Sequence, residues 1–208
     1  MKDEQDYIQD ITEMRSLMER SSKFMSLSGL AGIMAGIYAL TGAFIAYKIF
    51  HFNPDQVFYN TVQPESLFSG LQKIIFLAIL TLLLAIGTAI FLSGKKAARR
   101  RDIFWSPIAR RLLINMGVPL IAGGLLVIIL ISKGLIGLGA PLTLLFYGLA
   151  LFNASNFTYK EVKSLGLIDI GLGLIGSYFV EYGLLFWALG FGVAHIIYGI
   201  YIHYRYER

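Results

Sequence analysis

The two residues of this sequence best suited to chemistry are Asp169 and His195, which both lie within long apolar stretches. A carboxylate in the hydrocarbon of a membrane costs at least about 2.5 to 3.5 kcal/mol on insertion scales, so it needs a partner or a function. An imidazole gains or loses a proton near neutral pH, and a neighbouring carboxyl group can share a hydrogen bond with it. Such a pair could carry a proton or form the polar floor of a substrate pocket.

The spacing of the chain places these two side chains at one depth. Asp169 lies 13 residues before Tyr182, the centre of the turn Glu181-Tyr182-Gly183, and His195 lies 13 residues after it. Antiparallel helices that rise about 1.5 Å per residue therefore bring them level. We expect a buried polar pair, in which Asp169 accepts a hydrogen bond from a ring nitrogen of His195. The pair could serve function, or it could only fasten one helical hairpin.

Three asparagines fall in the same third of the expected bundle: Asn115, Asn153 and Asn156. Their amides could extend the Asp169–His195 pair into a polar pocket. They could equally cap helix ends at the level of the lipid headgroups. Both interpretations remain open at this point.

The absence of cysteine limits the chemistry further. It excludes disulfides, thiolate metal sites, iron–sulfur clusters and thiol catalysis. Haem held by two histidines would need a second His at the depth of His195, and His203 lies eight residues farther along the chain. We therefore expect neither a metal site nor a cofactor.

The elements that must position these residues are apolar stretches of membrane-spanning length. Hydrophobic residues make up 56% of the 208 residues and charged residues only 15%, where a soluble domain carries about 25% charged residues. Stretches of about 20 apolar residues, enough to cross roughly 30 Å of hydrocarbon, recur along the chain. We expect an all-α polytopic membrane protein with one six-helix transmembrane domain over residues 24–208. The expected spans are 24–47, 73–92, 112–132, 141–159, 164–180 and 183–204.

A basic stretch between the second and third spans, residues 93–111, fixes the expected orientation. Its bases are Lys95, Lys96, Arg99, Arg100, Arg101, Arg110 and Arg111. With the N-terminus inside, 15 of the 18 Lys and Arg residues fall on the cytoplasmic side, which is the positive-inside pattern. We expect both termini in the cytoplasm, in a plasma membrane or bacterial inner membrane.

The same basic stretch has two expected partners. Its side chains suit anionic lipid headgroups, or a protein partner. The net charge of +5 is explained by loops that hold the orientation, so nucleic-acid binding is not expected.

A new helix is expected to begin at Ser106-Pro107, with a cap and a proline in the first helical position, and to bend near Gly117 and Pro119.

Residues 1–23 form a predicted cytoplasmic amphipathic helix, because Tyr7, Ile11, Met14 and Met18 follow helical spacing. This helix could pack on its own bundle or bind a partner.

The first span carries small residues every four positions, including Gly32 and Gly36. Such stripes let helix backbones approach closely in lipid. We expect this span to be central in the bundle, or to form a homo-oligomer through that face.

These patterns indicate a class of function and no substrate. The leading interpretation is a non-enzymatic protein that binds or transports a small solute or proton through its helix bundle. The alternative is a scaffold or sensor subunit that engages a partner through residues 1–23 and the basic loop. The third interpretation is an intramembrane enzyme. Ala194-His195 in the last span resembles rhomboid proteases, but their Gly-x-Ser-Gly nucleophile motif is absent. The His-Glu-x-x-His motif of zinc proteases is absent as well.

Overall fold

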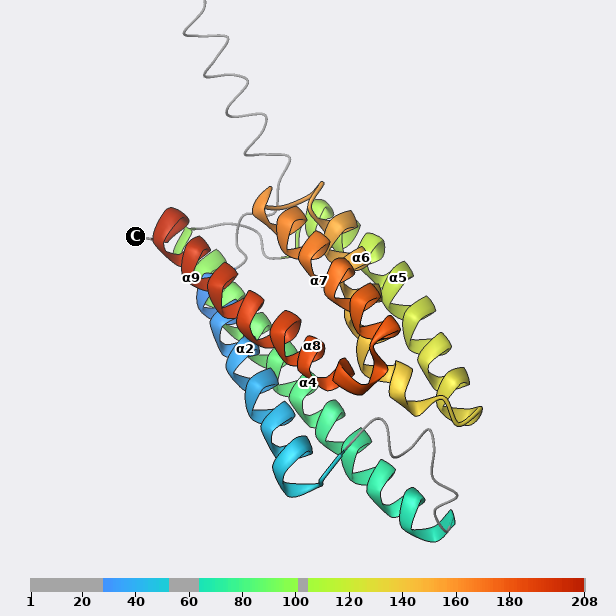
Figure 1. Ribbon diagram of the computed structural model, residues 1–208. Coiled ribbons are helices and arrows are strands. Elements are labelled where there is room, and N and C mark those ends of the chain that lie inside the picture. The colour runs from blue at the N-terminus through green and yellow to red at the C-terminus, as the bar shows by residue number, and fades with distance from the viewer. Residues whose placement is uncertain (1–27, 53–63, 101–104, 208) are drawn as a thin grey trace, which may run out of the picture.

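The computed structural model describes residues 28–52, 64–100 and 105–207, and every regular element within these ranges is a helix (Figure 1). The helices, in chain order, are α2 (Gly29–Phe44) with a π-helical continuation (Ile45–Ile49), α4 (Pro64–Arg100), α5 (Pro107–Ser132), α6 (Gly139–Ala154), α7 (Glu161–Tyr178), α8 (Gly183–Trp187), a π-helical segment (Ala188–Ala194) and α9 (His195–Tyr206). Short 3₁₀ turns, Ile136–Leu138 and Val180–Tyr182, precede α6 and α8. The prediction of an all-helical chain is confirmed for the described residues.

Five helical stretches in the described ranges are long and apolar enough to cross a membrane. They are Gly29–Ile49, Gly70–Arg99, Pro107–Ser132, Ile136–Ala154 and Val180–Tyr206. Helix α7 has 18 residues, among which Glu161, Lys163 and Asp169 are charged, and it is not one of the five. The count of six spans therefore stays a prediction.

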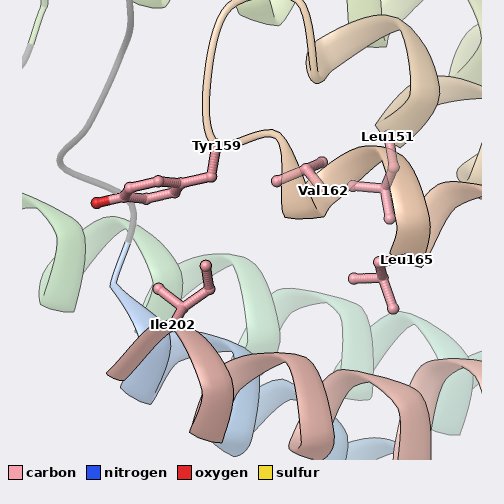
Figure 2. Packing of buried hydrophobic residues seen from close by; sticks show 5 residues of the cluster. All are labelled: Leu151, Tyr159, Val162, Leu165 and Ile202. Carbon is pink, nitrogen blue, oxygen red and sulfur yellow. The ribbon is translucent and has the colours of Figure 1, made fainter. Parts of the chain in front are cut away.

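Neighbouring helices run antiparallel and form two groups of three (Figure 1). In one group α2 lies between α4 and α9, and in the other α6 lies between α5 and α7. Helix α8 and the π-helical segment that follows it contact both groups. Near one end, a cluster of buried side chains also joins α6, the α6–α7 turn, α7 and α9 (Figure 2): Leu151, Tyr159, Val162, Leu165 and Ile202.

At this end of the bundle, which we call the Glu207 end, the carboxylate of Glu207 joins three helices. It accepts hydrogen bonds from the Gly29 N–H at 2.8 Å and from Lys96 Nζ at 2.9 Å, and its other oxygen lies 2.7 Å from Nδ1 of His203. Partial burial alone would raise the pKa of Glu207, but these hydrogen bonds outweigh it and lower that pKa to about 2. The beginning of α2 and the ends of α4 and α9 are thereby held together.

The basic stretch is more helical than the sequence predicts. Helix α4 continues to Arg100, so Lys95, Lys96 and Arg99 belong to its last turns and not to a loop. Hydropathy marks the edge of the apolar segment, while Ala, Lys and Arg are good helix formers that extend the hydrogen-bonded helix beyond it. Arg101 and the predicted helix of residues 1–23 lie outside the described residues.

Other helix boundaries test the sequence analysis as well. Helix α5 begins at Pro107, and Ser106 Oγ accepts a hydrogen bond from the Ala109 N–H at 3.2 Å, as predicted. Pro119 lies inside α5, which continues past it to Ser132. The predicted end of the fourth span at residue 159 is wrong, because α6 ends at Ala154 and a hydrogen-bonded turn follows.

The small residues of α2 bring helix backbones together within the chain. A Cβ atom added to Gly36 would lie 2.6 Å from the carbonyl oxygen of Gly192, and one on Gly32 would lie 3.2 Å from Cα of Gly199. The close approach was predicted, but the neighbour is the last helical stretch of the same chain. A second copy could reach Gly32 and Gly36 only by displacing that stretch, so the structure gives no support to a homo-oligomer through this face.

The outward surfaces of α4 and α5 are apolar over their middle parts, between the charged residues near their ends. Their large hydrophobic side chains include Phe76, Phe91, Val118 and Ile128, which are 65 to 69% exposed. A continuous apolar surface of this kind is unfavourable in water. It is the surface expected of helices whose solvent is lipid.

Candidate functional site

Asp169 lies in the middle of α7 and is completely buried. Neither of its carboxylate oxygens has a hydrogen-bond partner among the described residues. It packs closely against neighbouring elements: a Cβ atom added to Gly190 would lie 2.9 Å from Oδ1 of Asp169 and 2.5 Å from the side chain of Leu144. The structure therefore holds an unpartnered carboxyl group between α6, α7 and the π-helical segment before α9.

Small residues are what bring α7 close enough to bury this group. A Cβ on Gly166 would lie 2.7 Å from the Gly148 carbonyl oxygen, and one on Gly173 would lie 2.7 Å from the Leu145 backbone nitrogen. Gly166, Asp169 and Gly173 are buried on one face of α7, so the carboxyl group lies on the face that packs most tightly.

His195 is also buried, at the first position of α9, but its ring nitrogens have other partners. Nδ1 lies 2.8 Å from the carbonyl oxygen of Gly190, and Nε2 lies 3.0 Å from the hydroxyl oxygen of Tyr147. The predicted hydrogen bond from His195 to Asp169 is therefore wrong. Asp169 and His195 nevertheless lie in one region of the bundle, as their spacing predicts. Both are next to Gly190.

The partners of His195 determine its tautomer. A carbonyl oxygen only accepts hydrogen bonds, so Nδ1 must carry a proton and donate a hydrogen bond to the Gly190 carbonyl oxygen. In the neutral ring Nε2 then has no proton and accepts a hydrogen bond, which the Tyr147 hydroxyl donates. The imidazole is thus held by one backbone and one side-chain hydrogen bond, and it is fixed in orientation beside the buried carboxyl group.

Tyr147, on α6, is the site residue that the sequence analysis missed. Its ring packs against Phe191, with centroids 4.9 Å apart, and against the imidazole of His195 at 5.4 Å. The sequence contains a spacing signal for Tyr147 like the one for His195: Tyr147 lies 11 residues before Thr158, in the α6–α7 turn, and Asp169 lies 11 residues after it. Gly190, whose contribution is a backbone carbonyl, has no such signal in the sequence.

The helix that carries Gly190 and His195 is irregular. Residues Ala188–Ala194 form a π-helical segment between α8 and α9. π-Helical turns are rare and are found frequently at functional sites, because the wider turn alters how backbone and side chains are presented. Here the wider turn coincides with the Gly190 carbonyl that binds the imidazole.

The three asparagines do not extend this site. Asn115 is exposed, and its amide donates to the Arg111 carbonyl oxygen at 2.8 Å. Asn153 is exposed at the end of α6, and its carbonyl oxygen accepts from the Asn156 amide at 3.2 Å. The interpretation that Asn115, Asn153 and Asn156 form a pocket with Asp169 and His195 is wrong. The helix-end interpretation describes Asn156, whose amide binds a carbonyl oxygen in the last turn of α6, whereas Asn115 lies within α5.

The predicted lipid-contact residues whose side chains the structure describes lie at the Glu207 end. Lys95, Arg99, Arg110 and Arg111 are exposed there, so contact with headgroups stays a prediction for them. Lys96 is different, because its ammonium group binds Glu207 and lies 3.1 Å from the Tyr159 hydroxyl oxygen. For Arg100 only the helical backbone is described.

The chemical capacity of the site follows from these groups. It offers one buried carboxyl group without a hydrogen bond, one fixed imidazole and one tyrosine hydroxyl, all able to hold or pass a proton. Among the described residues, no three side chains of His, Asp or Glu converge as metal ligands would.

No protein-family model matches the chain, and no curated protein or solved structure is detectably similar to it.

Proposed function

We propose that this is an integral membrane protein that moves a proton, alone or together with a small solute, and that Asp169 is the group that carries the proton. The observation that supports this most is the complete burial of Asp169 with both carboxylate oxygens unpartnered. Ionisable groups inside membrane helices are costly and rare, and they commonly mark ion and proton paths.

The cost of this arrangement is the physical reason. A buried structural carboxylate is normally paired or hydrogen-bonded, since a charge without either is unfavourable by several kcal/mol. The Gly190 carbonyl cannot donate a hydrogen bond, and the Tyr147 hydroxyl is directed to His195. Only a proton or another cation could neutralise the Asp169 carboxylate. The proton is the one small enough for the close packing against Leu144 and Gly190.

The proposed orientation places the Glu207 end in the cytoplasm of a cell, with the plasma membrane or a bacterial inner membrane as its location. Helices α4 and α9 end there, and α5 and α7 begin there, so most basic residues of the described ranges gather at this end. Lys48, Lys73 and Lys133 lie toward the other end. This distribution supports the positive-inside orientation.

Proton movement can be measured in liposomes that contain the purified protein and a pH-sensitive dye. A potassium gradient with valinomycin supplies the driving potential. We expect D169N to reduce proton uptake to the level of protein-free liposomes. E181Q, the same carboxyl-to-amide change at an exposed turn residue, should leave uptake unchanged.

Two results would argue against the proposal. Equal uptake by the wild type, D169N and protein-free liposomes would contradict proton movement. Uptake by D169N at the wild-type rate, together with a lower unfolding temperature, would assign Asp169 a structural role. The scaffold alternative depends on residues 1–23, which lie outside the described residues, and it predicts a partner that is lost when they are deleted.

A further inference from the structure

A second polar feature lies at the Glu207 end, away from Asp169, where α6 turns into α7. There the surface forms an open hollow of about 360 Å³, lined by Ser155, Asn156, Lys160 and Lys163. The two lysines and the asparagine are exposed, and Ser155 is half-buried. A hollow of this size suits a small group, and it presents two ammonium groups to that group.

The positive charge of the hollow is not neutralised within the described part of the chain. Lys160 and Lys163 form no ion pair there, although the neighbouring residue Glu161 is a carboxylate. Glu161 is directed to α9 instead, where it accepts a hydrogen bond from the Tyr206 hydroxyl at 2.9 Å and pairs with Arg205 at 3.0 Å. The hollow therefore favours an anion.

The turn that forms the hollow is held by its own hydrogen bonds. Ser155 Oγ donates to the Phe152 carbonyl oxygen at 2.7 Å, and one N–H of the Asn156 amide donates to the Asn153 carbonyl oxygen at 3.2 Å. The second N–H of that amide remains for a ligand. An anion entering the hollow would meet an ordered turn and would not have to organise it.

The surface next to the lysines is apolar. Lys163 Nζ lies 5.2 Å from the ring centroid of Phe152. Leu167 and Leu174 lie farther along the same face of α7, at helical spacing from Lys163, and are 52% and 57% exposed. Gly171 lies between them, and a Cβ atom added there would meet no atom within 4 Å. A charged head with an apolar tail matches this order of surfaces better than a free anion does.

We propose that the hollow binds the phosphate headgroup of an anionic phospholipid, whose acyl chain lies along Leu167, Gly171 and Leu174. Phosphate oxygens accept hydrogen bonds from the ammonium groups of Lys160 and Lys163 and from the amide of Asn156. The site uses none of the residues around Asp169, so it is independent of the proposed proton movement.

The test is native mass spectrometry of the delipidated full-length protein in detergent, titrated separately with phosphatidylglycerol, phosphatidylcholine and inorganic phosphate. We expect the wild type to bind phosphatidylglycerol most tightly. K160A/K163A should weaken the tightest phosphatidylglycerol site about tenfold, because each lysine contributes attraction to an anionic headgroup. The two lysines are exposed and form no ion pair in the described part of the chain, so the unfolding temperature should change little.

The matched control is K73A/K133A, which removes two exposed lysines at the other end of the bundle. This variant should bind phosphatidylglycerol like the wild type. Equal binding by wild type and K160A/K163A would overturn the proposal, as would an equal loss of binding in K73A/K133A. Inorganic phosphate bound as tightly as phosphatidylglycerol would overturn the assignment to a lipid.

Discussion

The hydroxyl oxygen of Tyr147 lies 3.0 Å from Nε2 of His195, and this hydrogen bond connects the two groups of helices. Tyr147 belongs to α6 in one group, and His195 begins α9 in the other. The same imidazole is fixed by the Gly190 carbonyl through its other nitrogen. The polar centre of the bundle is therefore a short chain of groups beside Asp169, and not a direct Asp169–His195 pair.

Replacing Tyr147 with Phe tests this hydrogen bond. The variant leaves Nε2 of His195 buried without its donor, which we expect to lower the free energy of unfolding by about 1 to 3 kcal/mol. Thermal unfolding in detergent measures the change. Y178F removes the hydroxyl of a tyrosine that is 81% exposed and should have no effect, whereas equal stability of Y147F and Y178F would show that the hydrogen bond contributes nothing.

Replacing Gly190 with Ala tests the packing around Asp169. The new methyl group would meet Leu144 at 2.5 Å and Asp169 Oδ1 at 2.9 Å, and we expect a loss of about 1 to 3 kcal/mol in unfolding free energy from overpacking. In G124A the new methyl group on α5 meets no atom within 4 Å. That control should be neutral or slightly stabilising, since Ala favours a helix over Gly.

The stability of the Glu207 end should depend on pH. The pKa of Glu207 is lowered from 4.5 to about 2 in the folded protein, so the ionised carboxylate stabilises the fold fully above about pH 4.5. This contribution is lost as the pH falls from 4.5 toward 2. We expect E207Q to lower the unfolding free energy at pH 7 by about 1 to 3 kcal/mol, with allowance for partial exposure.

The pH dependence separates this effect from a general loss of packing. Other carboxyl groups titrate in the same range, so the measured quantity is the difference between wild type and E207Q in thermal unfolding from pH 7 to pH 3. That difference should shrink as the pH falls. A difference that stays constant would show that the Glu207 charge does not cause it.

Replacing Gly36 with Leu distinguishes packing within the chain from packing between chains. The side chain would have to enter the space occupied by the Gly192 carbonyl and Ile196. We expect a strong loss of thermal stability, of about 2 kcal/mol or more. G87L, on an open part of α4, should be tolerated. A stable G36L protein whose only change is a smaller oligomer would instead favour an interface between copies.

Much of the helical architecture could be predicted from the sequence because lipid imposes a simple rule. Apolar stretches of about 20 residues must be helical to satisfy their backbone groups. The boundaries were less predictable: α4 runs past its apolar segment through Lys95 and Arg99, since helix propensity does not end where hydropathy does. The Ser106 cap was predictable because it depends on local chemistry alone.

The candidate site could be predicted only in part. Spacing from a turn brought Asp169 and His195 to one depth, but it gives no rotation of the side chains about their helices. The π-helical segment changes that rotation just before His195, and the competing hydrogen-bond partners of the imidazole, the Gly190 carbonyl and the Tyr147 hydroxyl, are not encoded by spacing across the α7–α8 turn. The asparagines were misplaced for a related reason, because depth along a helix does not tell its buried face from its exposed face.

Proton movement through Asp169 requires that this carboxyl group exchange its proton with water. Infrared difference spectra of the protein in lipid bilayers, recorded as the pH is changed in H₂O and in D₂O, detect the carbonyl stretch of a protonated carboxyl group. We expect a band that titrates and shifts in D₂O, that is absent in D169N and that is retained in E181Q. A folded wild-type protein whose spectrum contains no such titrating band, or contains one that D169N retains, would contradict proton movement through Asp169.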